Sequence, residues 1–475
     1  MSKGNQNFDL FTPLVEGFVE IMQAFVEKGA THFGNSFQKS VVGDKSKHPM
    51  KVDYEMLFDK TTVTKAEDLG WSINQEGVYK LRYLTPHLHT FIIGASGWGK
   101  SNLLNILMEE NLKNGRPIIF IDPKGTKEAI RDFKALCKKY NRKCSIFSEH
   151  SPERVKFNAF PAMNADQALI MLMRSFYWGD YPNEYYLNCS REALKKVLDH
   201  LYSSKQSFGL KEIYKELEAK YAIEETKGLR TQLHLIVHSV FGHLFEVENE
   251  VETMSLMRAW EEGSCVYIGI STMGYQTLSQ TIGKMFVSEL QILAHNIGVR
   301  FDDQREAIKK SIGVFIDEAA SVLYSDFIDL ANKARSSGVN LTIATQSYSD
   351  MEMIGGSGTL MKQLMESFST WFVQRQLDAE NAEKLASIFG TYLSEKKTVM
   401  TEGGTESLKG SLREAYEFIC HPENLKSLHV GQAILLTMNP KDVHLLNIRD
   451  AKATQQNKEE VKKERKNFMS LGGQA

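Results

Sequence analysis

The sequence feature that most constrains the fold is a glycine-rich segment at residues 94–101, which follows the pattern Gly-x-x-x-x-Gly-Lys-Ser. Residues 91–93 before it form a short β-rich apolar run, and Leu103, Leu104 and Leu107 repeat at helical spacing after it. Glycines let backbone N–H groups wrap around phosphate oxygens, and a helix that follows directs its positive dipole end at them. The segment therefore predicts a strand, a phosphate-binding loop and a helix, in that order.

This pattern assigns chemistry to individual residues of the loop. Lys100 would reach the β and γ phosphates of ATP, and Ser101 would bind Mg²⁺. The alternative is a glycine turn that precedes a lysine by chance, but the flanking strand and helix favour the nucleotide site. The predicted nucleotide-binding residues are Gly94, Ala95, Ser96, Gly97, Trp98, Gly99, Lys100 and Ser101.

Length and composition indicate a large globular protein. The chain has 475 residues, and single cores stop growing near ~250–300 residues, so we expect two or three domains. Hydrophobic residues at 42% and charged residues at 24% exclude a disordered or fibrous chain. The five cysteines are scattered and lack metal-ligand spacing, which indicates a reducing compartment.

Charge and hydropathy narrow the partners and the location. The formal net charge is −2, so the overall field does not indicate a nucleic-acid partner, and any contact with a polyanion must be local. No run approaches the roughly 18 apolar residues needed to span a bilayer, and the N-terminus lacks the layout of a signal peptide. We therefore expect a cytoplasmic protein.

Changes of pattern along the chain predict its organisation. Apolar residues around Leu14 fall on one face of an acidic helix, which would dock on its own domain or on another protein. Farther along, strand-like and helix-like patterns alternate, which implies an α/β fold with a mainly parallel sheet covered on both faces. We predict an N-terminal amphipathic helix and linker at 1–50, a nucleotide-binding domain in two parts at 51–160 and 261–448, an all-α insertion at 161–260 and a charged tail at 449–475.

A second motif ends the apolar strand predicted at residues 312–316, where Asp317 and Glu318 follow directly. Ligands of parallel sheets gather outside the carboxyl ends of the strands, so two carboxylates there suit a metal–phosphate site. Asp317 would hold Mg²⁺, and Glu318 would act as general base on the attacking water. Taken alone, the pair fits a helix N-terminus favoured by its dipole, but a complete phosphate loop in the same chain favours function.

Two further polar residues fit the same chemistry. Gln346 follows the strand predicted at residues 339–345, where it can sense the γ-phosphate and orient the water. Arg335 lies at the end of the preceding helix, from which an arginine finger can reach a neighbouring subunit. Spacing alone would favour a surface arginine and a satisfied strand-end glutamine.

The order of these motifs resembles the type IV secretion coupling proteins, which are conjugative TraD/TraG-like ATPases of the FtsK/HerA class of P-loop motors. The resemblance extends over about residues 69–437 and rests on residues 94–101, Asp122-Pro123-Lys124-Gly125, the helical insertion, Phe315-Ile316-Asp317-Glu318, Ala334-Arg335 and Gln346. It implies a RecA-like sheet with ATP and Mg²⁺ between the subunits of a homohexamer. Arg335 then matches the family's trans-acting arginine, and Gln346 matches its sensor.

The resemblance also implies a function, an ATPase that moves DNA or nucleoprotein towards a secretion channel. Expected partners are DNA, a relaxase or secreted protein, and channel or membrane-anchor subunits. Most members have membrane-spanning helices near the N-terminus, where this chain has only the acidic helix near Leu14, so a partner would recruit it to the inner membrane or it would act in the cytosol. Lys124 is the one candidate DNA contact, and Trp98 is unusual in a loop where most members have a small residue.

Two other functions fit the same motifs. The first is a substrate-receptor platform that recruits protein cargo and uses ATP only to assemble, without threading DNA. The second is a HerA-like or viral genome-packaging DNA motor. DNA-stimulated ATP hydrolysis separates the first of these from a DNA translocase.

Overall fold

The computed structural model describes residues 67–452, apart from short gaps at 76, 85–87, 152–154, 180–182, 248–252, 302, 325–326, 354–358 and 403–404. The predicted N-terminal helix and linker therefore lie outside the described residues, as does the charged tail from residue 453. Among the described residues, no helix is both long and apolar enough to cross a membrane.

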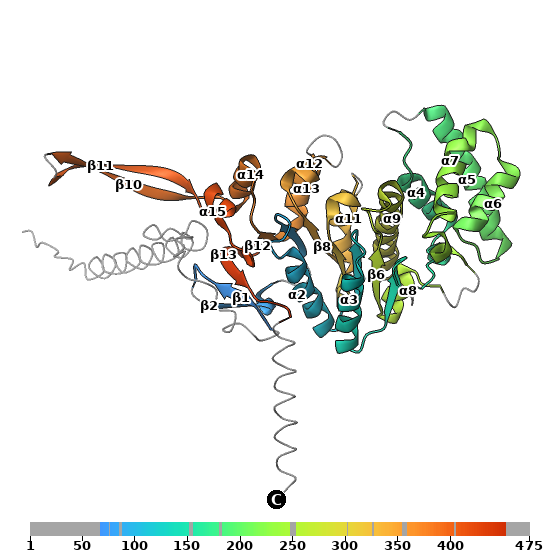
Figure 1. The fold of residues 1–475 in the computed structure, drawn as a ribbon, viewed down its shortest axis with the longest axis horizontal. Coiled ribbons are helices and arrows are strands. Elements are labelled where there is room, and N and C mark those ends of the chain that lie inside the picture. The colour runs from blue at the N-terminus through green and yellow to red at the C-terminus, as the bar shows by residue number, and fades with distance from the viewer. Residues whose placement is uncertain are drawn as a thin grey trace, which may run out of the picture.

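A large mixed sheet forms the centre of the described part (Figure 1). It has eleven strands in the order β2-β1-β13-β12-β9-β3-β8-β7-β4-β6-β5. From β9 to β5 every neighbouring pair is parallel. These strands are short, apolar and buried on both faces, as parallel strands are when helices cover the whole sheet. They are β9 (Phe368–Val373), β3 (His89–Ile93), β8 (Val339–Thr345), β7 (Ile312–Ile316), β4 (Ile118–Asp122), β6 (Cys265–Gly269) and β5 (Cys144–Phe147).

Four antiparallel strands extend the sheet beyond β9. They are β12 (Gln432–Met438), β13 (Lys441–Ile448), β1 (Asp68–Ser72) and β2 (Gly77–Lys80). These four strands pair antiparallel with their neighbours, unlike the rest of the sheet. The fold is nevertheless the predicted α/β type, because the strands that carry the motifs belong to the parallel part.

Helices cover the two faces of the parallel part, and alternate residues of each strand enter different apolar clusters. On β4, Ile119 and Ile121 belong to one cluster, whereas Ile118 and Phe120 belong to the other. The face of Ile118 is covered by α2 (Lys100–Lys113) and α3 (Lys127–Lys139). The opposite face is covered by α9 (Gln276–Arg300), α10 (Gln304–Lys309), α11 (Phe327–Lys333), α12 (Tyr348–Met353), α13 (Thr359–Ser367) and α14 (Ala379–Phe389).

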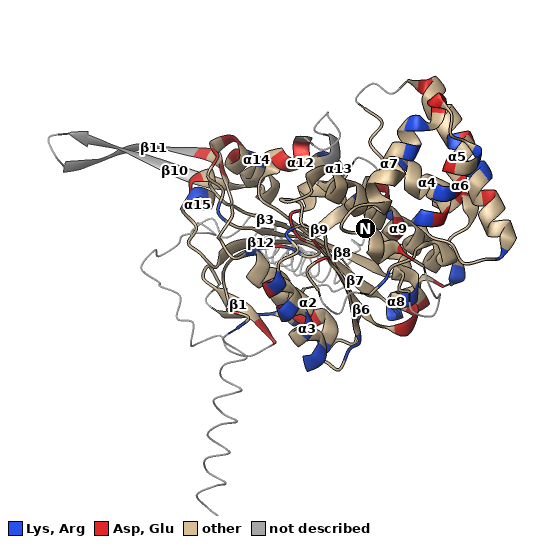
Figure 2. Cartoon of the chain, turned by 45° about the vertical axis from the view of Figure 1, so that its right-hand side comes forward, with Lys and Arg blue, Asp and Glu red and all other residues tan. Residues whose placement is uncertain are grey.

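A group of helices lies beyond β5 at one end of the sheet (Figure 1), between β5 and β6 in the sequence. The first helix begins with a capping box, because the Asn164 side chain accepts from the backbone of Gln167 and the Gln167 side chain accepts in return. Basic and acidic residues are interspersed on these helices (Figure 2). They are α4 (Ala165–Ser175), α5 (Glu184–Ser204), α6 (Leu210–Lys220), α7 (Lys227–Val237) and α8 (Leu256–Glu262).

A long hairpin projects from the other end of the sheet (Figure 1). It consists of β10 (Thr391–Glu402) and β11 (Thr405–Phe418), which pair from Thr391 opposite Phe418 to Glu402 opposite Thr405. The short helix α15 (Pro422–Ser427) follows it and leads into β12. The sequence analysis did not predict this hairpin, since its strands are rich in charged residues and lack a clear apolar alternation.

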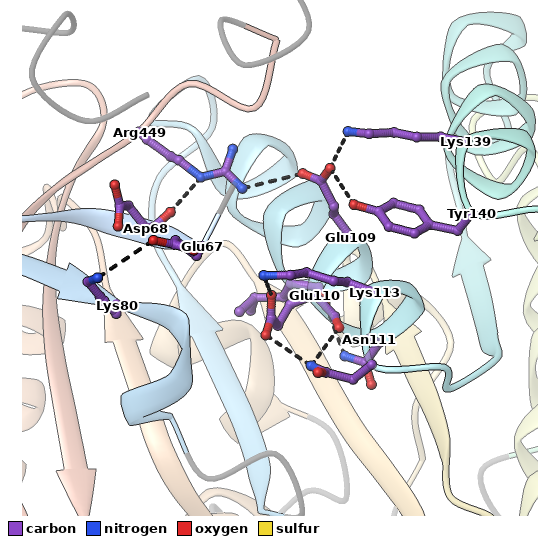
Figure 3. A network of polar contacts seen from close by, with 12 residues as sticks. Glu67, Asp68, Lys80, Glu109, Glu110, Asn111, Lys113, Lys139, Tyr140 and Arg449 are labelled. Carbon is purple, nitrogen blue, oxygen red and sulfur yellow. Dashed lines mark hydrogen bonds and ion pairs between the residues drawn. The ribbon is translucent and has the colours of Figure 1, made fainter. Parts of the chain in front are cut away.

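A buried ion pair fastens α2 to the edge of the sheet (Figure 3). The fully buried Arg449 donates to the backbone carbonyl of Asp68 at 2.5 Å and lies 3.3 Å from a carboxylate oxygen of Glu109 on α2. Glu109 also accepts from Tyr140 at 2.9 Å and from Lys139. Burial alone would raise the pKa of Glu109, but Lys139, Tyr140 and Arg449 together hold it below its usual value. Breaking such a pair is costly, so it fixes the helix that follows the phosphate loop.

Candidate active site

The phosphate loop connects β3 to α2, as the sequence analysis predicted. Gly97 and Gly99 have φ angles of 84° and 101°, which side chains rarely tolerate. Gly94 is constrained differently, because a Cβ atom there would lie 2.5 Å from the Cβ of Gln374. Gly99 is the N-cap of α2 and has no side chain to cap it, so the first N–H groups of the helix are available to an anion.

The side chain of Lys100 is folded back onto its own loop. Its ammonium donates to the carbonyl of Gly94 at 2.5 Å and to that of Ala95 at 3.0 Å. Burial lowers the pKa of Lys100, and the charges of Glu318 and Asp317 oppose this effect. Lys100 and the two carboxylates therefore lie within electrostatic reach of one another.

The carboxylates stand where the sequence analysis expected them, at the carboxyl end of β7. Asp317 is buried, and one of its oxygens accepts from the N–H of Glu318 at 2.9 Å. Glu318 has a positive φ of 44°, an uncommon conformation for a residue with a side chain and one associated with functional sites. Its carboxylate accepts a hydrogen bond from the side-chain amide of Gln346 at the end of the neighbouring strand β8. The structure thus brings Lys100, Asp317, Glu318 and Gln346 to one edge of the sheet.

A cavity of about 500 Å³ opens at this edge. Among its lining residues are Gly99, Ser101, Asp122, Lys124 and Asp317. Hydroxyl and carboxylate oxygens are what Mg²⁺ prefers, and Mg²⁺ usually takes only one or two protein carboxylates beside phosphate and water. Ser101 and Asp317 therefore fit the ion, and within residues 67–452 no richer group of His, Cys, Asp and Glu forms a competing metal site.

Asp122 is a site residue to which the sequence analysis gave no role. Its carboxylate accepts from the Tyr267 hydroxyl at 2.6 Å and from the backbone N–H of Lys124 at 2.9 Å. Burial raises its pKa, and these two hydrogen bonds oppose the rise. The position of Asp122 in the Asp-Pro-Lys-Gly motif, directly after a buried strand, could have identified it as a site residue. Its partner Tyr267 on β6 stands in no motif, so this hydrogen bond could not be predicted from the sequence.

Lys124 lies within the candidate site. Its ammonium is 3.7 Å from a carboxylate oxygen of Asp317 and 3.7 Å from one of Glu318, and its side chain is 51% exposed. The suggestion that Lys124 contacts DNA is not tested by this position.

Arg335 is separated from the other predicted site residues. It lies in the 3-10 turn at Ala334–Ser337, before β8 begins, whereas Gln346 follows the end of β8. The seven residues of β8 rise ~3.3 Å each, so the strand that separates the two is roughly 23 Å long. Arg335 is exposed, and its charge acts instead on His89, the first residue of β3. Within one chain, therefore, Arg335 stands at the edge opposite the phosphate loop.

Trp98 packs on protein groups beside the phosphate loop. Its indole N–H donates to the carbonyl of Leu428 at 3.2 Å, and the guanidinium of Arg375 lies 4.9 Å from its ring centroid. The carbonyl of Arg375 accepts from Ala95 in the loop at 2.9 Å. Trp98 thus fastens the loop to the connections after β9 and α15, which accounts for the tryptophan that the sequence analysis noted as unusual in such a loop.

Two family models match parts of the chain. One, described as "Helicase HerA, central domain", matches residues 83–288, and one described as "TraM recognition site of TraD and TraG" matches residues 311–429. Among curated proteins, an uncharacterized protein of Mycoplasma pneumoniae (strain ATCC 29342 / M129 / Subtype 1) is 38% identical over 61 residues, which cover 13% of this chain and 49% of that protein. The chain therefore matches about half the length of this relative.

Several solved structures share the fold. The bacterial conjugative coupling protein TrwBdeltaN70 is 18% identical with a TM-score of 0.59, over 82% of this chain and 90% of that chain. TrwB in complex with ADP and Mg²⁺ is 17% identical with a TM-score of 0.59, over the same shares. VirB4 of Thermoanaerobacter pseudethanolicus is 14% identical with a TM-score of 0.54, over 81% of this chain and 96% of that chain.

Identities this low show a shared fold, that of a RecA-like P-loop NTPase with a mainly parallel sheet. The two family models add matches over the segments that carry the phosphate loop and the Asp317–Glu318 motif. Together they confirm that this chain resembles the TraD/TraG-like coupling ATPases of the HerA class.

Proposed function

We propose that this chain is an ATP-driven coupling protein, which works as a homohexamer and delivers DNA or nucleoprotein to a type IV secretion channel. The observation that carries the proposal is the division of the catalytic set between two edges of the sheet. Lys100, Glu318 and Gln346 converge at one edge, and Arg335 stands at the other. An arginine finger that cannot reach its own site is suited to a ring, in which each subunit supplies the arginine of its neighbour.

Each residue then has a distinct part in hydrolysis. Lys100 exchanges the carbonyls of Gly94 and Ala95 for phosphate oxygens, which bind an ammonium more strongly because they are charged. Ser101 and Asp317 would hold Mg²⁺, which would neutralise phosphate charge. Glu318 accepts the proton of the attacking water, and Gln346 orients the Glu318 carboxylate through their hydrogen bond.

The proposed partners follow from the position of the matched segments. The segment described as the TraM recognition site in relatives spans residues 311–429 and includes the whole β10–β11 hairpin. We assign to this segment a protein partner of the DNA-processing complex, and to a membrane protein the recruitment of the ring to the inner membrane. The charges on the described helices are mixed in sign (Figure 2), so DNA contacts would be few and local.

The division of the chain into the five segments predicted from the sequence, from the N-terminal helix and linker to the charged tail, remains part of this proposal.

The test is ATP hydrolysis measured with and without single- and double-stranded DNA at low salt. The purified full-length protein should be stimulated several-fold by DNA, and Lys100→Ala and Glu318→Gln should each reduce hydrolysis at least 100-fold. Glu318→Gln should still bind nucleotide, because the substitution preserves shape and removes only the charge.

Two other outcomes would point to the alternative functions. ATP hydrolysis that no DNA stimulates, together with copurified secretion subunits, would replace the proposal with a protein-substrate platform. Stimulation by DNA with no binding to secretion subunits would favour a HerA-like motor, which the match of residues 83–288 also allows.

A further inference from the structure

Lys124, the lysine of the Asp-Pro-Lys-Gly motif, lies beside the phosphate loop and the Asp317–Glu318 motif but has no role in either. Its backbone is fixed by the Asp122 carboxylate, which accepts from the N–H of Lys124 at 2.9 Å. The neighbouring carbonyl of Pro123 accepts from both the backbone N–H and the hydroxyl of Thr272, at 2.8 and 3.0 Å. The turn after β4 therefore holds Lys124 in front of the carboxylates.

The contacts that the Lys124 side chain makes are weak. Its ammonium is 3.7 Å from each of Asp317 and Glu318, longer than the roughly 2.7–2.9 Å of a charge-assisted hydrogen bond. One oxygen of Glu318 is buried without a hydrogen-bond partner, so this ion pair does not satisfy it. The side chain is also half-exposed, and exposed ion pairs contribute little to stability. Lys124 can therefore change partners at small cost.

The cavity shows where the new partner would lie. Lys124 lines the same cavity as Gly99, at the start of α2, and Ser101. A nucleotide whose phosphates lie against the phosphate loop would bring several negative charges into this cavity. A divalent cation on Asp317 would at the same time repel the ammonium. Both effects move Lys124 from the carboxylates towards the phosphates.

We propose that Lys124 is a second phosphate-binding lysine, which exchanges its ion pairs with Asp317 and Glu318 for the terminal phosphate of a nucleoside triphosphate when one binds. The inference rests on the proposed function as an ATPase. It gives Lys124 a role inside the site, in place of the DNA contact suggested by the sequence.

The test is equilibrium binding of fluorescent ADP and of a fluorescent, non-hydrolysable ATP analogue to the full-length protein without DNA. Lys124→Ala should bind the ATP analogue roughly tenfold more weakly than the wild type and bind ADP within about threefold, because only the triphosphate offers the terminal phosphate. Lys127→Ala is the matched control, since Lys127 is an exposed lysine three residues away that does not line the cavity. It should bind both nucleotides like the wild type.

A second measurement separates this role from general damage to the site. The Mg²⁺ concentration that half-saturates ADP binding should fall in Lys124→Ala, because the two carboxylates lose a competing cation; a distorted site would need more Mg²⁺. Unchanged binding of the ATP analogue by Lys124→Ala would overturn the inference, and loss of DNA stimulation in that variant would then support a DNA contact. If the wild type itself bound neither nucleotide, the proposed function would fail, which is a different result.

Discussion

The two edges of the parallel sheet differ in the polar groups that a single chain places there. At the carboxyl edge, residues of the phosphate loop and the residues at the ends of β4 and β7 line a cavity with charges of both signs, including Lys124 and Asp317. At the amino edge, His89 is buried between backbone groups and Arg335 is exposed beside it. One chain thus has a charged cavity at the carboxyl edge, whereas at the amino edge it presents the exposed Arg335.

The largest effect is expected from Arg335. Arg335→Ala should lower kcat by roughly 10³-fold and leave nucleotide affinity within about threefold, because an arginine finger stabilises transition-state charge and its own site lies elsewhere. Steady-state hydrolysis and equilibrium nucleotide binding measure the two quantities. Lys333→Ala, which removes an exposed neighbour at the end of α11, is the control and should retain full activity. If Lys333→Ala lowered kcat as much as Arg335→Ala, the loss would reflect a disturbed structure at this edge and not a specific role of Arg335.

A smaller effect is expected from Gln346 at the carboxyl edge. Gln346→Ala removes the amide that holds the Glu318 carboxylate, so kcat should fall roughly 10- to 100-fold with little change in KM. Gln346→Glu places a second carboxylate beside Glu318 and should raise its pKa, which shifts the pH–rate profile of the residual activity upwards. An unshifted profile in that variant would show that Gln346 does not act through Glu318.

The smallest effect is expected at His89, and it concerns stability rather than turnover. His89 donates to the carbonyl of Ala331 at 2.9 Å and accepts from the N–H of Leu341 at 3.1 Å, so the neutral ring is required. Burial, assisted by the charge of Arg335, lowers the pKa of His89 to about 4, and the hydrogen bond to Ala331 opposes this. Between about pH 6.5 and pH 4 the unfolded state binds a proton that the folded state does not, so stability falls as pH falls, by about 3 kcal/mol in all.

This pH dependence is isolated by comparing urea unfolding of the wild type with that of His89→Gln. The comparison is needed because burial raises the pKa of Glu289 to about 8, which lowers stability as pH rises above about 4.5. Both proteins keep the Glu289 contribution, so only the His89 contribution appears in the difference. A difference that does not change between pH 7 and pH 4.5 would contradict the buried neutral histidine.

Much of the carboxyl edge could be predicted from the sequence because its motifs are local. Lys100 and Ser101 follow from the glycine pattern, and Asp317 and Glu318 follow from their place after an apolar strand. The parallel strands were predictable for a related reason, since buried runs such as Ile312–Ile316 are short, apolar and bounded by polar residues.

The rest depends on contacts between residues far apart in the sequence. Gln374 excludes a side chain at position 94, and Tyr267 holds Asp122, but neither has a local pattern. Arg449 contacts Glu109, which lies 340 residues earlier in the sequence. Nothing in the sequence around Arg449 indicates that this charged side chain is fully buried. The hairpin β10–β11 was missed because its sequence is rich in charged residues and shows no clear apolar alternation.

The central claim, that each site is completed by the Arg335 of another subunit, is tested most directly by mixing two inactive proteins. Lys100→Ala keeps a functional arginine, and Arg335→Ala keeps a functional phosphate loop. If the site is shared, ATP hydrolysis should reappear when the two variants are mixed under assembly conditions, and it should rise with the fraction of mixed interfaces. Hydrolysis that stays at the level of the separate variants, although native mass spectrometry shows mixed oligomers, would contradict the shared site.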